Sequence, residues 1–94
     1  MLTTGTKGKA EVKVDDTNTA VTMGSGSLKV FATPAMIALI EKAACTALEG
    51  QLEDGQTTVG TKLDVAHVAA TPVGMNVTAE AVLTEIDNRR LVFE

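Results

Sequence analysis

A single long helical segment, which we predict over residues 34 to about 49, limits the folds that this chain can adopt. Thr33 can cap the free N–H groups of the first turn, and proline, here Pro34, is preferred at the first helical position. Gly50 follows as a stop signal. A helix of about sixteen residues is longer than average, and a chain of 94 residues supports only one domain. The rest of the chain must therefore pack against this helix.

Extended segments stand before and after the helix. Apolar and polar residues alternate over residues 10–14, 57–69 and 76–86, which is the period of a strand with one buried face. A last short strand is predicted over residues 91–93. The order of one strand, a long helix and an antiparallel meander predicts an α+β domain, because a helix lying across an antiparallel sheet buries both apolar faces.

Composition argues against several classes of function. The net charge is −4, only 2% of the residues are aromatic, and the basic residues are scattered, so we expect no nucleic-acid partner. The longest apolar run, residues 35–40, is too short to span a bilayer, so we expect no membrane partner. One cysteine and one histidine do not make a recognisable metal site. The single cysteine and the lack of an apolar signal segment favour a cytoplasmic location.

One carboxylate on the predicted helix stands apart from the other polar residues. On a wheel of 100° per residue, Glu41 lies about 140° from Met36. It falls between Leu48 and Cys45 and well away from the polar sector of the helix. It is either a boundary residue whose carboxylate reaches water or Lys42, or a carboxylate in partly apolar surroundings that is suited to general-base work. In the second case it marks an active site.

Three other side chains could carry chemistry. His67, the only histidine, shares the apolar parity of its predicted strand with Leu63 and Val65, so it points toward the helix or toward a subunit interface. It is either a hydrogen-bonded core residue or a catalytic group. Thr33 is explained by helix capping alone. Cys45 has no second cysteine or nearby histidine in the sequence, so we interpret it as a buried structural thiol.

Two blocks of the sequence make a fairly specific combination. In residues 24–44, GSGSLKVFATPAMIALIEKAA, the helix start ATPAM carries a glutamate eight residues after its threonine. In the second block, TTVGT at residues 57–61 is followed by His67 and then by ATPVGM at residues 70–75. Together the blocks resemble the fluoroacetyl-CoA thioesterase-like group of hotdog-fold proteins, and the likeness extends over residues 7–93.

This resemblance implies a fold, an activity and a set of site residues. The fold is the hotdog fold, a long central helix packed on an antiparallel sheet. The activity is hydrolysis of a small acyl-CoA thioester, with no cofactor because coenzyme A is part of the substrate. The family's catalytic threonine, glutamate and histidine fall on Thr33, Glu41 and His67. Its glycine that offers a backbone N–H to the thioester carbonyl falls on Gly60.

The chain departs from the family pattern after its last predicted strand. Relatives usually continue through one or two further strands with a Gly-Thr-His-x-Arg-like segment, so we expect residues 1–94 to form a single hotdog domain that lacks these strands. An exposed sheet edge would then need a partner to cover it. Because small domains without disulfides are also often stabilised by association, we expect a homodimer or a higher homo-oligomer.

The spacing along the helix bears on where the site forms. Thr33 and Glu41 are separated by about 12 Å of helix rise, so they cannot touch within one helix. We therefore expect a thioesterase site near a dimer interface, or one bridged by substrate and water. The alternative is a non-catalytic acyl-CoA-binding or degenerate hotdog protein, which would bind without turnover. A hydratase acting on enoyl-CoA has less support, because no second carboxylate–histidine pairing is visible.

Overall fold

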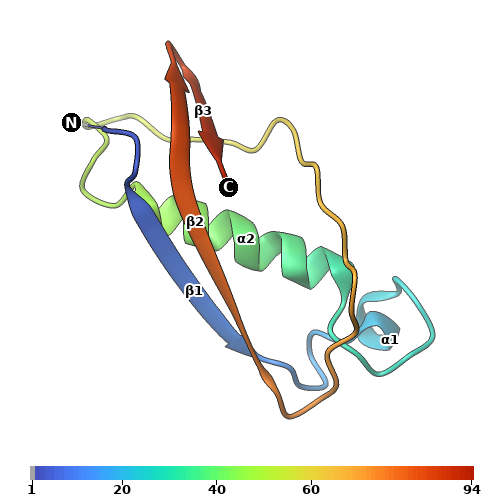
Figure 1. The fold of residues 1–94 in the computed structure, drawn as a ribbon. Coiled ribbons are helices and arrows are strands. Elements are labelled where there is room, and N and C mark those ends of the chain that lie inside the picture. The colour runs from blue at the N-terminus through green and yellow to red at the C-terminus, as the bar shows by residue number, and fades with distance from the viewer. Residues whose placement is uncertain (1) are drawn as a thin grey trace.

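The computed structural model of the chain describes residues 2–94 and shows a long helix lying across one face of an antiparallel sheet (Figure 1). The sheet has three strands in the order β1-β2-β3, with β2 in the centre. In chain order the elements are β1 (Lys7–Lys13), α1 (Ala20–Met23), α2 (Thr33–Ala47), β2 (Asn76–Asp87) and β3 (Arg90–Phe93). This is the α+β arrangement that the sequence predicts. None of the helices within residues 2–94 is long and apolar enough to cross a membrane.

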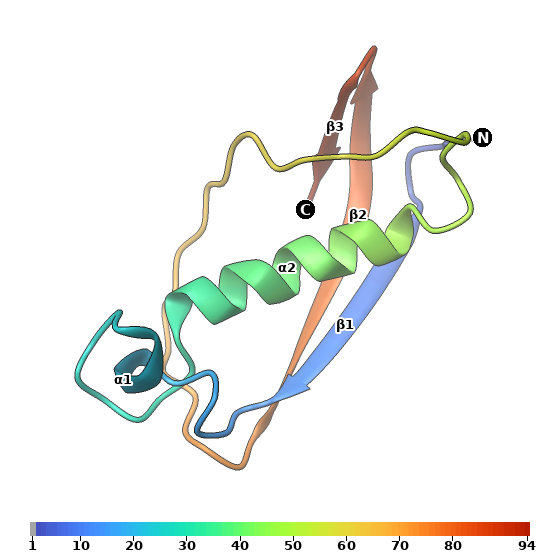
Figure 2. The same cartoon turned by 180° about the vertical axis from the view of Figure 1, so that it is seen from behind.

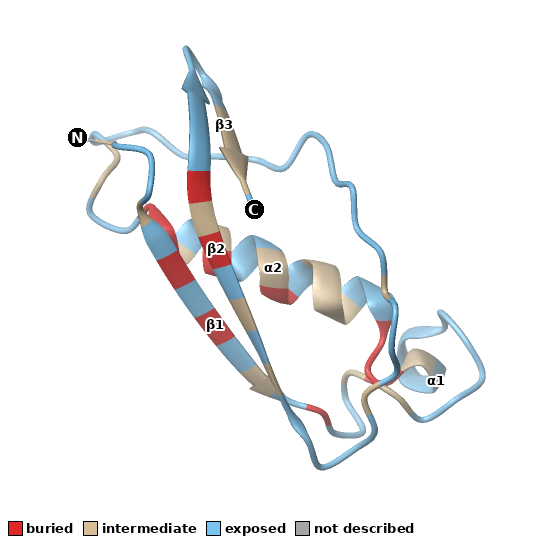
Figure 3. Ribbon diagram, in the orientation of Figure 1, coloured by how far each residue is buried: buried red, intermediate tan, exposed pale blue. Residues whose placement is uncertain are grey.

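The alternation of small and charged residues decides which face of the sheet carries the helix. β1 and β2 pair antiparallel along the whole length of β1. Their buried side chains include Ala10, Ala81 and Leu83, which lie on the face that α2 covers (Figure 3). Lys9 and Glu80, which are register partners, are exposed. The predicted strands at 10–14, 76–86 and 91–93 are thus confirmed as β1, β2 and β3.

Helix α2 lies unusually close to β1. It rests on the sheet through Leu39, Ala43 and Ala47, a stripe of buried residues four apart. Gly8 of β1 lies directly against this stripe, because a Cβ built on Gly8 would overlap the carbonyl oxygen of Ala43 and the backbone nitrogen of Ala47. The helix and strand backbones are therefore in direct contact, which only a glycine in the strand permits.

The ends of the long helix agree with the sequence signals. The helix runs from Thr33 to Ala47, and Leu48 is its C-cap. Gly50 follows in the left-handed conformation, with φ 73°, as the predicted stop signal requires. The difference of one or two residues from the predicted range is the normal fraying of helix ends.

The strand predicted over residues 57–69 is wrong. These residues have no regular secondary structure, and within the described chain none of their backbone groups bonds to another backbone group. β1 and β3 both pair with β2, and the 57–69 segment is paired with none of these strands. It instead runs along α2 (Figure 2). Alternating side chains can predict one buried face, but a strand also needs a neighbour for its hydrogen bonds.

A short helix, α1, precedes the long one and is not predicted by the sequence pattern. Thr19 caps it by accepting a hydrogen bond from the N–H of Thr22, and Gly24 ends it in the left-handed conformation. In the turn before it, Asp15 accepts hydrogen bonds from the hydroxyl and the backbone N–H of Thr17, and these bonds lower the pKa of the Asp15 carboxyl. Four residues are too few to show helical periodicity.

We expect the substitution Gly8→Ala to destabilise the domain. The added methyl group would collide with backbone atoms of α2, which cannot move aside as a side chain can. Overpacking of this kind costs about 1–3 kcal/mol of the free energy of unfolding. Urea denaturation followed by circular dichroism measures the loss. Lys9→Ala, one residue further along β1 and exposed, should stay within about 0.5 kcal/mol of the wild type; equal stability of Gly8→Ala and wild type would contradict the close packing.

Candidate functional site

Thr33 is the first residue of α2 rather than its cap. Ala32 occupies the N-cap position with an extended backbone, φ −73° and ψ 140°, and no side chain caps the helix. The expectation that capping explains Thr33 is therefore wrong, because its hydroxyl is engaged elsewhere. Oγ1 of Thr33 lies 2.8 Å from Nδ1 of His67, within hydrogen-bond distance.

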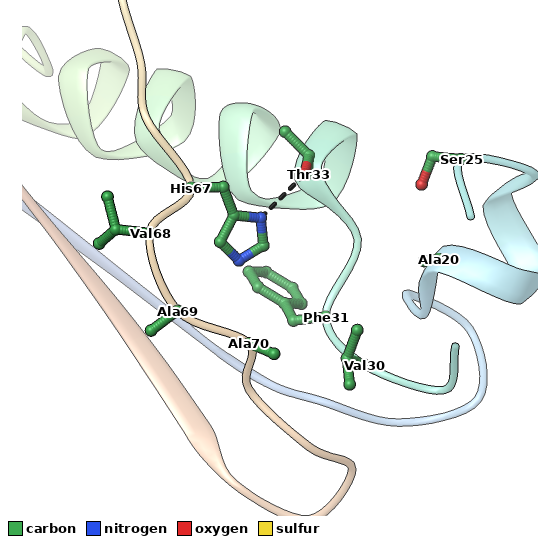
Figure 4. Close-up of a pocket in the computed structure, with 9 residues that line it drawn as sticks. All are labelled: Ala20, Ser25, Val30, Phe31, Thr33, His67, Val68, Ala69 and Ala70. Carbon is green, nitrogen blue, oxygen red and sulfur yellow. Dashed lines mark hydrogen bonds between the residues drawn. The ribbon is translucent and has the colours of Figure 1, made fainter. Parts of the chain in front are cut away.

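His67 reaches the start of α2 from the 57–69 segment. This segment runs beside the helix in the opposite direction, so its later residues approach the first turn of α2 (Figures 1 and 2). His67 is half-buried, and its imidazole is joined to the Thr33 hydroxyl (Figure 4). The expectation that His67 points toward the helix is confirmed, although the backbone that carries it is not a strand.

Glu41 lies against Gly60 of the same segment. A Cβ built on Gly60 would be 2.6 Å from Oε2 of Glu41, so any larger residue at position 60 would displace the carboxylate. Glu41 is exposed, as the interpretation of it as a boundary residue predicts, and it does not have the partly apolar surroundings of the alternative. It precedes buried Ala43 by two residues, a rotation of about 200°, which turns it to the side of α2 away from the sheet.

The four residues that the sequence singled out therefore form two pairs, Thr33 with His67 and Glu41 with Gly60. The helix and the 57–69 segment are antiparallel, so both pairs lie along the same side of α2. Eight residues of helix separate the pairs, about 12 Å of rise. Within one chain, a single small group can contact only one pair at a time.

A cavity of about 240 Å³ opens beside the Thr33–His67 pair (Figure 4). Ala20 and Ser25, from α1 and the loop after it, lie across this cavity from His67. Sequence reasoning missed this wall, although Thr19 and Gly24 carry the cap signals of a short helix. Besides Thr33 and His67, the lining consists mostly of apolar side chains: Ala20, Ser25, Val30, Phe31, Val68, Ala69 and Ala70.

A second cavity, of about 300 Å³, lies beyond the C-terminal end of α2. Cys45 lines it and is exposed, so the interpretation of Cys45 as a buried structural thiol is wrong. Cys45 follows buried Ala43 by two residues and therefore turns away from the sheet. The second cavity is the larger one, but no imidazole lines it. The candidate site is therefore the cavity beside Thr33 and His67.

The candidate site offers a hydroxyl–imidazole pair and, along the same side of the helix, a carboxylate. A hydroxyl bonded to an imidazole fixes the ring and decides which of its nitrogens faces a ligand. An exposed carboxylate is a proton acceptor for water. These are the groups from which sites for acyl transfer are commonly built. Among residues 2–94, no group of three or more His, Cys, Asp or Glu side chains converges as metal ligands would.

The sequence of this chain is similar to those of fluoroacetyl-CoA thioesterases. The family described as fluoroacetyl-CoA-specific thioesterase matches residues 14–94. A curated relative, the fluoroacetyl-CoA thioesterase of Streptantibioticus cattleyicolor, is 44% identical over 63 residues. The aligned part is 67% of this chain and 45% of the relative, so the chain spans less than half the length of the curated relative that it matches.

Solved structures of the same kind share the fold. A structure of the fluoroacetyl-CoA thioesterase FlK superposes with a TM-score of 0.91 and 31% identity, over 99% of this chain and 73% of that one. A variant of that enzyme, solved in complex with fluoroacetate and CoA, gives a TM-score of 0.89 and 33% identity, over 98% of this chain and 78% of that one. The hotdog fold predicted from the sequence is confirmed.

The bond between Thr33 and His67 can be tested by NMR, because His67 is the only histidine and gives the only imidazole signals. If the Thr33 hydroxyl donates to Nδ1, the ring proton stays on Nε2. At about pH 8.5, where imidazoles are neutral, we expect a long-range ¹H–¹⁵N spectrum to show this single tautomer. Thr33→Val should give a mixture of tautomers, and Thr33→Ser should keep the wild-type pattern. An unchanged spectrum in Thr33→Val would mean that the hydroxyl does not hold the ring.

Proposed function

Because the chain belongs to the fluoroacetyl-CoA-specific thioesterase family, we propose that it hydrolyses an acyl-CoA thioester. The observation that carries this proposal is the 2.8 Å contact between Oγ1 of Thr33 and Nδ1 of His67 at the side of a cavity. The matching relatives are thioesterases of fluoroacetyl-CoA, and one was solved with fluoroacetate and CoA, which supports the same class of substrate for this chain.

In this proposal the Thr33–His67 pair binds the thioester carbonyl. The Thr33 hydroxyl donates to Nδ1, which leaves a proton on Nε2 of His67. Nε2–H then donates to the carbonyl oxygen, where negative charge develops as the carbon becomes tetrahedral. The backbone N–H of Gly60 serves as a second donor to the same oxygen. Two donors aimed at one oxygen stabilise the transition state more than the ground state.

In this proposal Glu41 accepts a proton from water and later donates it to the leaving group. Its carboxylate takes a proton from a water molecule as the water oxygen attacks the carbonyl carbon. The carbon–sulfur bond then breaks, the carboxylic acid product keeps the water oxygen, and Glu41 passes its proton to the departing thiolate of CoA. Exposure of Glu41 supports this role, since water can reach the carboxylate.

A second copy of the chain would bring the two pairs together. The 57–69 segment has unpaired backbone groups and exposed apolar side chains, including Val59 and Leu63, as expected for a surface that another strand covers. Antiparallel pairing about a twofold axis between residues 63 and 64 would set Gly60 of one copy opposite His67 of the partner subunit. Within one chain the two pairs are about 12 Å apart along α2. In the homodimer, Glu41 of one copy would lie near His67 of the partner subunit, so each site would form at the dimer interface.

We further propose that residues 1–94 act as a single hotdog domain in the cytoplasm. One core cluster joins α2 to β1 and β2, which supports a single folding unit. The exposed thiol of Cys45 has no second cysteine to pair with in the sequence and fits a reducing compartment. Coenzyme A is part of the substrate, so the proposed reaction needs no further cofactor.

We expect Glu41→Gln and His67→Ala each to lower kcat/KM for acyl-CoA hydrolysis by about 10²–10⁴. The first removes the proton acceptor and the second removes a donor to the carbonyl oxygen. Release of free CoA thiol from a panel of acyl-CoAs measures the activity, and circular dichroism checks the fold.

Glu49→Gln is the matched control, because Glu49 is an exposed glutamate beyond the other end of the same helix. It should keep wild-type activity. Full activity in both site variants would overturn the assignment. Tight binding of acyl-CoA by the wild type without thiol release would instead select a non-catalytic acyl-CoA-binding protein.

The proposed dimer can be tested at Asp64. Proline lacks the N–H that strand pairing uses, so Asp64→Pro should break the pairing near its axis. We expect sedimentation velocity to show a dimer for the wild type and for Asp64→Ala, and a monomer with strongly reduced activity for Asp64→Pro. A monomeric wild type with full activity would show that the two pairs need no second copy.

A further inference from the structure

Phe31 belongs both to the hydrophobic core and to the candidate site. It is only 2% exposed and is part of the core cluster between α2 and the sheet. It also lines the cavity beside Thr33 and His67, and Figure 4 shows its ring next to the imidazole. We infer that Phe31 is a positioning residue, whose ring packs against the imidazole of His67 and fixes the plane of that imidazole. The inference rests on the proposed thioesterase function and explains how its histidine is oriented.

The hydrogen bond from Thr33 does not by itself fix the orientation of the imidazole. It joins Oγ1 of Thr33 to one ring nitrogen of His67, Nδ1, at 2.8 Å. A single bond of this kind sets a distance but lets the ring turn about the axis of the bond. Because the N–H of Nε2 lies in the plane of the ring, such a turn swings it away from its acceptor, and hydrogen bonds weaken steeply as their angle decreases. The ring therefore needs a second support.

The side chain of Phe31 is suited to be this support. Aromatic rings pack against one another in preferred geometries, so a neighbouring ring restricts the tilt of the imidazole. Among the side chains that line the cavity, Phe31 carries the only ring besides that of His67. Its burial in the close-packed core holds Phe31 in one rotamer. A ring held in this way is a fixed surface on which the imidazole can rest.

Backbone pairing brings the two rings to the same place. The N–H of Phe31 donates to the carbonyl oxygen of Thr71 at 2.8 Å, and Val30 and Pro72 form an antiparallel bridge. Thr71 follows His67 by four residues, so this pairing holds the chain that carries the histidine against the chain that leads into α2. These bonds use main-chain atoms only. Replacing the Phe31 side chain therefore tests the ring separately from the pairing.

The chain around Phe31 is also fixed on its other edge. The N–H of Ala32 donates to the carbonyl oxygen of Asn18 at 2.9 Å, and Thr19 forms an antiparallel bridge with Phe31. Residues 30–32 thus lie between two other pieces of chain and are bonded to both. Phe31 cannot shift easily with respect to the core, which is the property that a positioning residue needs.

NMR of the free protein tests the contact directly. We expect nuclear Overhauser effects between the ring protons of Phe31 and the two carbon-bound imidazole protons of His67, the only histidine. Phe31→Leu should move both imidazole signals, because the ring current of the phenylalanine is lost. Phe31→Met serves in the same way if Phe31→Leu fails to fold. The absence of any such Overhauser effect in the wild type would overturn the inference.

Phe93→Leu is the matched control. Phe93 is the only other phenylalanine, it packs against the same core cluster, and it does not line the cavity. The same chemical change there should lower the stability measured by urea denaturation but leave the imidazole signals of His67 in place. Equal shifts of these signals in Phe93→Leu and Phe31→Leu would mean that general loosening of the core moves the imidazole, and would contradict a specific role of Phe31.

The kinetic signature of a positioning residue is a lower kcat at an unchanged KM. For Phe31→Leu we expect kcat for acyl-CoA hydrolysis to fall about two- to tenfold, the factor that corresponds to one aromatic pair, and KM to stay within about twofold of the wild type. Phe93→Leu should match the wild type in both constants. A raised KM with an unchanged kcat would show that Phe31 contributes only to binding and would refute the positioning role.

Thiol release by the wild type separates this inference from the proposed function. Overshauser effects between Phe31 and His67 without release of thiol from any acyl-CoA would leave the support of the imidazole assigned and refute the hydrolase. Release of thiol without these effects would support the hydrolase and refute the role of Phe31.

Discussion

The backbone of α2 contacts the backbone of β1 at Gly8, and this contact determines how the helix lies on the sheet. With only 2% aromatic residues, the chain cannot fill a wide gap between helix and sheet, so small residues bring the two layers together. Ala43 and Ala47 meet Gly8 without intervening side chains. This packing fixes the rotation of the helix, and the rotation turns Glu41 away from the sheet toward the other side of α2.

The 57–69 segment supplies the contact partners of Thr33 and Glu41 on the side of α2 that faces away from the sheet. By running antiparallel to α2, it presents Gly60 to Glu41 and His67 to Thr33. At position 60 a Cβ would take the space of the Glu41 carboxylate, so a larger residue would displace that side chain. The segment has no strand partner in the described chain, which supports the proposed association with a second copy.

Parts of the fold that depend on residues a few positions apart could be predicted from the sequence. Parts that depend on contacts between residues far apart in the chain could not. Pro34 and Gly50 bracketed the long helix, and alternation located β1 and β2, because these signals act within a few residues. The same alternation misassigned 57–69, since a strand also needs a neighbour that local pattern does not report. The wheel isolated Glu41 but left open whether its carboxylate reaches water, and capping rules could not show that the Thr33 hydroxyl bonds to a histidine 34 positions away.

If the two pairs belong to one thioester site, NMR titration of the protein with the thioether S-ethyl-CoA will show all four residues responding to one ligand. The compound cannot be hydrolysed, so the amide signals report binding alone. We expect the signals of Thr33, Glu41, Gly60 and His67 to shift together with one binding constant. Shifts confined to one pair, or to the residues around Cys45 at the other end of the helix, would contradict it.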